Sequence, residues 1–274
     1  MDSTSAPRFE AMTTGALLDR AFRLYTGNFS LMLGITAAAY VPFYLIMLII
    51  ESRLGANVQA PSGGLSTLLL QIGFMVLWAS VAFPIAGGAA TYAISERYLG
   101  NDVTIGEALR VALSSFWTLS VAQITATIRV LFGFLLLVVP GILWLLSYAL
   151  VVPAILVENQ KATASLRRSR DLVKGHRGKV FCVMLVINLL QGIPIFGVGM
   201  ISGMIFNTQS GSGAVLNSAI INLVSIFLTP LAIVATILLY YDMRIRKEGF
   251  DLEMLSRAIT ASTESVAAAP TLSR

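Results

Sequence analysis

The charged residues of this chain gather in a few short blocks, and six long stretches between those blocks carry almost none. Hydrophobic residues make up 56% of the chain and charged residues only 12%, whereas soluble domains carry about 25% charged residues. A chain with so little polar surface cannot coat a soluble globule, so much of its surface must face lipid. The pattern therefore indicates a membrane-spanning protein.

Each apolar stretch is long enough for a transmembrane helix, which needs about 20 apolar residues. We expect an all-α, polytopic membrane protein with a six-helix transmembrane domain over 29–241, whose spans are 29–50, 66–95, 115–139, 141–157, 180–206 and 217–241. The third and fourth spans are divided at Pro140-Gly141, a pair that favours a tight turn; the alternative is one long kinked segment. A β-barrel is excluded because the stretches do not alternate apolar and polar residues.

The positively charged residues predict the orientation of the chain. Of the 19 Lys and Arg residues, all except Arg53 and Arg129 precede the first span, follow the sixth, or lie after the second and fourth. Positive loops face the cytoplasm, so both termini and both long loops are expected there. Residues 1–28 then form a cytoplasmic segment with an interfacial helix, and 242–274 form a cytoplasmic helix, at 252–260, and a disordered tail.

The segments that precede the first, third and fifth spans share a pattern. Residues 16–27 match 164–175 at five positions, three of them apolar or small and two of them Arg and Gly, and 107–117 match more loosely. Each unit would be a cytoplasmic amphipathic helix followed by a helical hairpin, so that the six spans form three hairpins around a pseudo-symmetry axis. Chance similarity among helices rich in Leu and Arg is the alternative.

The sequence also predicts where two of these pre-span helices begin or end. Thr104 and Glu107 have the spacing of a capping box, which starts the second helix. Gly175 is a natural stop for the third. In that third helix a narrow, weakly apolar stripe recurs at helical spacing, formed by Leu166, Ser169, Leu172, Val173 and His176.

The loop that contains this third helix is strongly basic. A basic helix with a modest apolar face lies in the headgroup layer, where each basic residue gains about 1 kcal/mol near an anionic leaflet. Together with Arg129, the predicted lipid-binding residues are Lys161, Arg167, Arg168, Arg170, Lys174, Arg177 and Lys179. The alternative is that these residues only set the topology. Nucleic acid is not expected as a partner, because the block adjoins membrane spans and is not interleaved with aromatic residues.

Arg129 is the only charged residue inside the predicted spans. A charge within the membrane is costly, so a functional role is the first hypothesis. It would need backbone carbonyls, a lipid phosphate, a route to one face of the membrane, or a polar neighbour from the set Gln71, Gln123, Asn188, Gln191 and Asn222. Contact with an anionic lipid or substrate and a structural role at a different depth both remain open.

Residues that carry chemistry are scarce. The spans contain no Asp or Glu, which disfavours proton- or sodium-coupled transport. The single histidine, His176, lies on the basic loop, and the single cysteine, Cys182, falls in the fifth span. No nucleophile elbow, phosphate loop or metal-ligand spacing occurs. We therefore expect a protein that is not an enzyme and that has no cofactor or metal site.

Two stretches carry a family resemblance. The first runs from Pro140-Gly-Ile-Leu-Trp through Pro153-Ala-Ile-Leu-Val-Glu158 to Ser165-Leu-Arg-Arg-Ser-Arg-Asp-Leu-Val-Lys-Gly175, and the second is Tyr240-Tyr-Asp-Met-Arg-Ile-Arg-Lys-Glu-Gly-Phe-Asp-Leu-Glu253. In them the chain resembles the membrane domain of bacterial glycerophosphodiester phosphodiesterases and related stand-alone membrane proteins. The resemblance extends over about residues 15–255. It implies a multi-helix module of the bacterial inner membrane, but not the activity, because residues 256–274 are too few for the soluble barrel that cleaves glycerophosphodiesters.

These observations predict a non-enzymatic integral inner-membrane protein that binds anionic phospholipid, or a protein partner in the membrane, through a basic cytoplasmic face. The alternative is an uncoupled transporter, lipid translocator or pore with Arg129 in the pathway. A closed bundle with an arginine-rich cytoplasmic ring would favour the first function. A continuous polar cavity that reaches Arg129 would favour the second.

Overall fold

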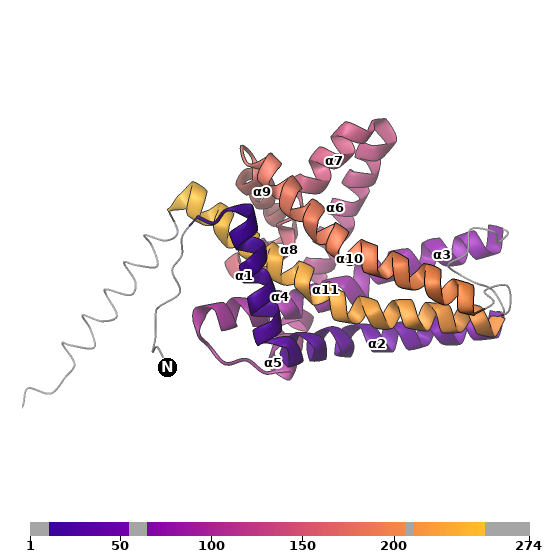
Figure 1. Ribbon diagram of the computed structural model, residues 1–274. Helices are drawn as coiled ribbons and strands as arrows, with labels where there is room; N and C mark the ends of the chain where they lie inside the picture. Colours follow the sequence, from indigo (N-terminus) through magenta and orange to yellow (C-terminus); the bar gives the residue numbers. More distant parts are fainter. Residues whose placement is uncertain (1–10, 55–64, 207–210, 250–274) are drawn as a thin grey trace, which may run out of the picture.

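The computed structural model describes residues 11–54, 65–206 and 211–249, and all regular structure in these ranges is helical. In chain order the elements (Figure 1) are α1 (Thr14–Gly27), α2 (Phe29–Leu54), α3 (Leu65–Leu77), the π-helical turn η1 (Trp78–Ala82), α4 (Phe83–Leu99), α5 (Ile105–Ser114), α6 (Phe116–Leu136), α7 (Val138–Ser147), α8 (Val151–Glu158), α9 (Ala162–Val173), α10 (Arg177–Ile205) and α11 (Gly211–Glu248). The all-α prediction is confirmed for these residues. The predicted helix at 252–260 and the tail after it lie outside the described ranges.

Helix α11 is the central element of the fold. It contacts α1, α2, α4, α8, α9 and α10, and Figure 1 shows it running along the molecule between α2 and α10. Between Val234 and Met243 every side chain except Thr236 is buried. A helix segment that is buried on all sides needs neighbours on all sides. The core therefore gathers around residues 234–243, in the C-terminal half of α11.

Five of the described helical segments are long and apolar enough to cross a membrane, namely Phe29–Ile50, Phe116–Leu136, Val138–Glu158, Arg177–Ile205 and Ser212–Glu248. They correspond to the first, third, fourth, fifth and sixth predicted spans. The second predicted span, 66–95, is helical throughout but is divided among α3, η1 and α4, and it is not one of the five. The protein is therefore a helical membrane protein, and the predicted count of six spans is not confirmed.

The π-helical turn in this second segment depends on a proline and on a contact with another helix. Pro84 has no N–H group to donate to the carbonyl of Ser80, four residues earlier. That carbonyl instead accepts a hydrogen bond of 2.7 Å from the hydroxyl of Ser120 in α6. The proline therefore removes one hydrogen bond within the segment 66–95 and leaves a carbonyl that bonds to α6.

The turn between α6 and α7 does not lie at Pro140-Gly141, so that predicted position is wrong. The chain breaks at Leu137, whose backbone is extended, with φ −165° and ψ 155°. Pro140 is the third residue of α7, where a missing N–H costs no helical hydrogen bond. The glycine serves packing instead, because a Cβ built on Gly133 of α6 would lie 2.9 Å from Gly141 Cα.

The fourth predicted span, 141–157, falls within Val138–Glu158, one of the five segments, but its helix is interrupted. Helix α7 ends at Ser147, the chain turns, and α8 begins at Val151. The hydroxyl of Ser169 in α9 donates to the Ser147 carbonyl at 2.7 Å and accepts from the Leu150 N–H at 3.1 Å. Broken helices are tolerated at membrane depth only where such backbone groups find partners, and one side chain supplies both.

The three predicted pre-span helices are confirmed as α1, α5 and α9. Thr104 and Glu107 form the predicted capping box, in which the Glu107 N–H donates to the Thr104 hydroxyl and the Thr104 N–H donates to the Glu107 carboxylate. Gly175 follows the end of α9 with a φ of +92°, a left-handed conformation that glycine adopts without strain. The pseudo-symmetry axis stays a prediction.

Helix α9 does not use its apolar stripe as expected. Leu166, Ser169, Leu172 and Val173 are buried, and His176 is half-buried, because this face packs against α6, α7, α8 and α11. The apolar stripe is therefore covered by protein, and the position of α9 in the headgroup layer stays a prediction. Only the charged face of α9 is free to meet lipid.

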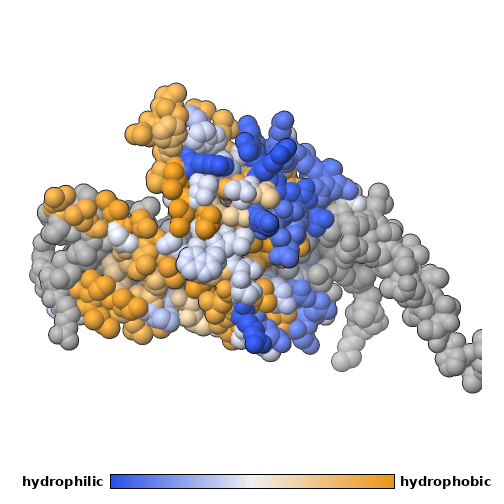
Figure 2. Space-filling model, turned by 180° about the vertical axis from the view of Figure 1, so that it is seen from behind, coloured by the Kyte–Doolittle hydropathy of each residue, from blue (hydrophilic) through white to orange (hydrophobic). Residues whose placement is uncertain are grey.

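Polar and apolar surfaces are separated along the molecule. Figure 2 shows hydrophilic residues gathered at one end of the body and hydrophobic residues over most of the rest of this face. The hydrophilic end is the one that holds α9 and the end of α11 (Figure 1). The candidate functional groups lie at this end and at its border with the apolar part.

Candidate functional site

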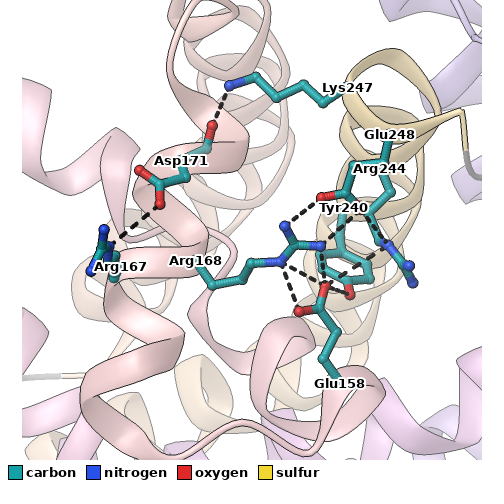
Figure 3. A network of polar contacts seen from close by, with 8 residues as sticks. All are labelled: Glu158, Arg167, Arg168, Asp171, Tyr240, Arg244, Lys247 and Glu248. Atoms are coloured by element: carbon teal, nitrogen blue, oxygen red, sulfur yellow. Dashed lines mark hydrogen bonds and ion pairs between the residues drawn. The ribbon is translucent and has the colours of Figure 1, made fainter.

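Charged side chains from three helices meet at the polar end of the bundle (Figure 3). Arg168 of α9 lies between Glu158, the last residue of α8, and Glu248, the last residue of α11. Its Nε donates to Glu158 Oε2 at 2.7 Å, and its Nη2 donates to Glu248 Oε2 at 2.8 Å. One guanidinium group on α9 thus joins the ends of α8 and α11.

Arg244 and Tyr240 of α11 complete this ion-pair network. Arg244 Nε lies 3.2 Å from Glu248 Oε2 and 3.8 Å from Glu158 Oε1. The Tyr240 hydroxyl donates to Glu158 Oε1 at 2.7 Å. The hydrogen bonds of Arg168 to Glu248, and then those to Glu158, raise the pKa of its guanidinium above the ordinary value. Two positive and two negative charges therefore balance within the network.

Asp242 forms the centre of a second cluster, and its side chain is 0% exposed. Oδ1 accepts a hydrogen bond from the main-chain N–H of Met12 at 2.7 Å. Oδ2 accepts from Lys179 Nζ at 2.5 Å and from Arg246 Nε at 3.0 Å. The carbonyl of Met12 accepts from the same two side chains. The Asp242 cluster thus ties the segment before α1 to α10 and α11.

Sequence reasoning missed both clusters, because it looked for acids inside the spans and treated the basic residues as unpaired. The acids Glu158, Asp242 and Glu248 all lie at the ends of apolar segments. Two of them stand four residues from an arginine on α11, Asp242 with Arg246 and Glu248 with Arg244, a spacing that brings side chains together on a helix. That spacing is the signal that could have found them.

The structure divides the predicted lipid-binding residues of the basic loop into two groups. Arg168 and Lys179 are engaged in the clusters above, with side chains 27% and 15% exposed. The basic surface, as we name it, comprises the exposed remainder: Lys161, Arg167, Arg170, Lys174 and Arg177. In the described part of the chain, the one ion pair that this surface makes is a loose one, 3.9 Å, between Arg167 Nε and Asp171 Oδ2.

Arg129 lies on an exposed face of α6, away from the basic surface along the chain. Its Nη1 contacts the Tyr148 hydroxyl at 3.3 Å, and its guanidinium carbon is 5.9 Å from the centre of the Tyr148 ring. Among the described contacts, no hydrogen bond joins it to Gln123, Asn188 or Asn222. The Tyr148 partner comes from the turn after α7, which the sequence did not predict.

Three of the polar residues considered as neighbours of Arg129 line one cavity instead. Gln123 of α6 and Asn188 and Gln191 of α10 border a space of about 480 Å³ among α4, α6, α8, α10 and α11. Tyr148, the partner of Arg129, lines it as well. The side chain of Gln71 is outside the described part of the structure.

Neither metal-ligand geometry nor comparison with known proteins identifies the function of the chain. Within the described residues, no group of three or more His, Cys, Asp or Glu side chains could hold a metal ion. Neither a protein-family model, nor a curated protein, nor a solved structure matches the chain. The resemblance to the membrane domain of the phosphodiesterases therefore rests on the sequence motifs alone.

Proposed function

We propose that this chain is a non-enzymatic, multi-pass protein of the bacterial cytoplasmic membrane that binds anionic phospholipid headgroups through its basic surface, with both termini in the cytoplasm. The observation that carries the proposal is the exposure of five basic side chains within one short stretch. That stretch lies at the polar end of a bundle that is otherwise largely apolar on the face that Figure 2 shows.

The geometry of α9 supports this assignment. Arg167, Arg170 and Lys174 follow one another at intervals of three and four residues, which places them on one side of a helix. The opposite, apolar side of α9 is buried against the protein, so the charged side faces outward. At about 1 kcal/mol per basic residue near an anionic leaflet, five such residues suffice to select anionic over zwitterionic headgroups.

The internal clusters support the same proposal by exclusion. Arg168 and Lys179 already have carboxylate partners, so they are structural. Among the described residues, those of the basic surface have no such partner apart from the loose Arg167–Asp171 pair. Exposed charges that are not needed for folding are available for a ligand.

Native mass spectrometry of the purified protein tests the proposal. We expect wild type to retain phosphatidylglycerol in preference to phosphatidylethanolamine, and the double variant Arg170→Gln with Lys174→Gln to lose much of that preference. A matched control removes the same charge from exposed positions elsewhere, Arg23→Gln with Arg110→Gln. Equal phosphatidylglycerol retention by the two double variants would overturn the assignment to the basic surface.

A second candidate function is an uncoupled transporter, lipid translocator or pore with Arg129 in its pathway. The observation in its favour is the cavity that reaches Tyr148, the contact of Arg129. Flux measurements in liposomes test it: dithionite bleaching of fluorescent phospholipid in the inner leaflet should be accelerated by wild type and not by Arg129→Gln. Equal bleaching with and without the protein would remove this candidate.

A further inference from the structure

The basic surface does not explain the cavity among α4, α6, α8, α10 and α11. Its volume is about 480 Å³, within the range of roughly 300–1,000 Å³ that is typical of small-molecule sites. Several of its lining residues, among them Leu131, Phe134 and Leu145, are also exposed on the outer surface. A lipid-like ligand therefore has a route into it from the apolar surroundings.

The lining is mostly apolar, with a few polar side chains. Gln191 Nε2 donates to the Leu228 carbonyl at 2.8 Å, and Asn188 Nδ2 donates to the Met184 carbonyl at 2.7 Å. These bonds hold both amides to their own helices or to α11. A binding site with apolar walls and a few fixed polar groups suits an amphipathic ligand.

One positive charge contacts a residue of the cavity wall. Arg129 contacts Tyr148, which lines the cavity, and in the described part of the chain it has no carboxylate partner. It is the only charged residue within the predicted spans. Because an unpaired charge is costly in a membrane, an anionic group at this part of the wall would be stabilised by the guanidinium, whose planar donors fit a carboxylate at two points.

The volume indicates the size of the ligand. A space of about 480 Å³ is of the size that one acyl chain occupies. We infer that the cavity is a binding site for a long-chain fatty acid, whose chain lies among the five helices and whose carboxylate pairs with Arg129. This site is separate from the basic surface and goes beyond the function proposed above.

Gly87 provides the means to test this site. A Cβ built on Gly87 of α4 meets nothing within 4 Å, and the residue lines the cavity, so a larger side chain there enters open space. On neighbouring Gly88 a Cβ would lie 2.9 Å from Leu119 Cδ1, which makes that position unsuitable. The Gly87→Leu variant should therefore fold and block the space for the acyl chain. Thr127→Phe, in α6, should block the same space from another wall.

The experiment measures binding of dansyl-undecanoic acid to the purified full-length chain by fluorescence, with oleate and oleyl alcohol as competitors. We expect wild type to bind oleate, and Gly87→Leu and Thr127→Phe each to weaken binding by at least about tenfold. Arg129→Gln should weaken the binding of oleate by about tenfold, as expected for the loss of a charged hydrogen bond. The binding of oleyl alcohol, which has no charge, should be unchanged. The basic-surface variant Arg170→Gln with Lys174→Gln should bind oleate as wild type does.

The outcomes separate this inference from the proposed function. Wild type that fails to displace the probe with oleate, or cavity variants that bind oleate as wild type does, would overturn the fatty-acid site and leave the basic surface untouched. Equal weakening of oleate and oleyl alcohol by Arg129→Gln would overturn the pairing with the carboxylate. Native mass spectra in which the cavity variants lose a bound two-chain phospholipid, and not bound oleate, would also overturn the inference.

Discussion

The carboxylate of Asp242 accepts a hydrogen bond of 2.7 Å from the main-chain N–H of Met12, 230 residues earlier in the chain. Residues near the two ends of the described chain are thus joined inside the protein, beside Lys179 and Arg246. A fully buried carboxylate is tolerated here because two cations and an N–H group replace its lost hydration.

Replacing Asp242 should destabilise the protein strongly. Asp242→Asn keeps an acceptor for the Met12 N–H but leaves Lys179 and Arg246 without their negative partner, and breaking a buried pair in this way costs about 3–5 kcal/mol. Thermal unfolding in detergent measures the loss. The control is Asp102→Asn, which removes an exposed partner of Arg97 and should change stability by about 1 kcal/mol or less. Similar losses in the two variants would contradict the role of burial.

Neighbouring arginines of α9 should behave differently when each is replaced. Arg168→Gln leaves Glu158 and Glu248 with only Arg244 as a cation, so we expect a loss of about 1–3 kcal/mol of unfolding free energy. Arg168→Lys should recover only part of it, because an ammonium lacks the planar donors of a guanidinium. Arg170→Gln should stay within about 0.5 kcal/mol of wild type. The idea fails if Arg170→Gln is the more destabilised variant in thermal unfolding.

The capping box of α5 should make the stability of the protein depend on pH. Hydrogen bonds from the backbone and then the side chain of Thr104 lower the pKa of the Glu107 carboxyl below its ordinary value of 4.5. A lowered pKa means that the contribution of Glu107 to stability is complete above the unfolded value and is lost as pH falls through the folded one. We expect the stability difference between wild type and Glu107→Gln to shrink between pH 6 and pH 3. Melting temperatures across this range measure it, and a constant difference would contradict the cap.

The close approach of α6 and α7 should make Gly133 intolerant of a side chain. Its Cβ would lie 2.9 Å from both Gly141 Cα and the Trp144 ring, and such overpacking costs about 1–3 kcal/mol. In the matched control, Gly192→Ala, the new Cβ meets nothing within 4 Å, so a neutral or slightly stabilising effect is expected. Thermal unfolding of the two alanine variants compares them directly, and a stable Gly133→Ala would refute the close packing.

The parts of this fold that sequence reasoning reached are those with local causes. Apolar stretches, the capping box at Thr104 and the glycine stop at Gly175 each follow from residues adjacent in the chain, and the structure confirms the helices that they predict. The divided second segment was missed because Pro84 acts through Ser120 of another helix. The break after Ser147 carries no local signal either, since its partner is Ser169.

The candidate site was predictable only in its composition. The sequence identified the basic loop, but it could not separate Arg168 and Lys179 from their exposed neighbours, because Glu248 and Asp242 lie 80 and 63 residues away from them. Arg129 was singled out for its isolation, yet its contact with Tyr148 depends on a turn that the sequence did not reveal. Charge spacing along α11 was the unused information.

The hydroxyl of Ser169 should be needed for the turn between α7 and α8. Ser169→Ala removes a donor from the Ser147 carbonyl and an acceptor from the Leu150 N–H. Leaving buried backbone groups unpaired costs about 1–3 kcal/mol. Hydrogen exchange should become faster at Leu150 in this variant, whereas Ser114→Ala, which loses only a hydrogen bond within α5, should leave it unchanged. Unaltered exchange at Leu150 would contradict the role of Ser169.

Ser169 joins the helix that carries the surface charge to the turn that forms part of the cavity wall. The charged side of α9 carries Arg167 and Arg170, while its buried side holds the turn that contains Tyr148, a wall of the cavity. Under the two proposals above, a headgroup that shifts α9 would shift that wall as well. By thermodynamic reciprocity, an occupant of the cavity would then alter headgroup affinity by the same factor.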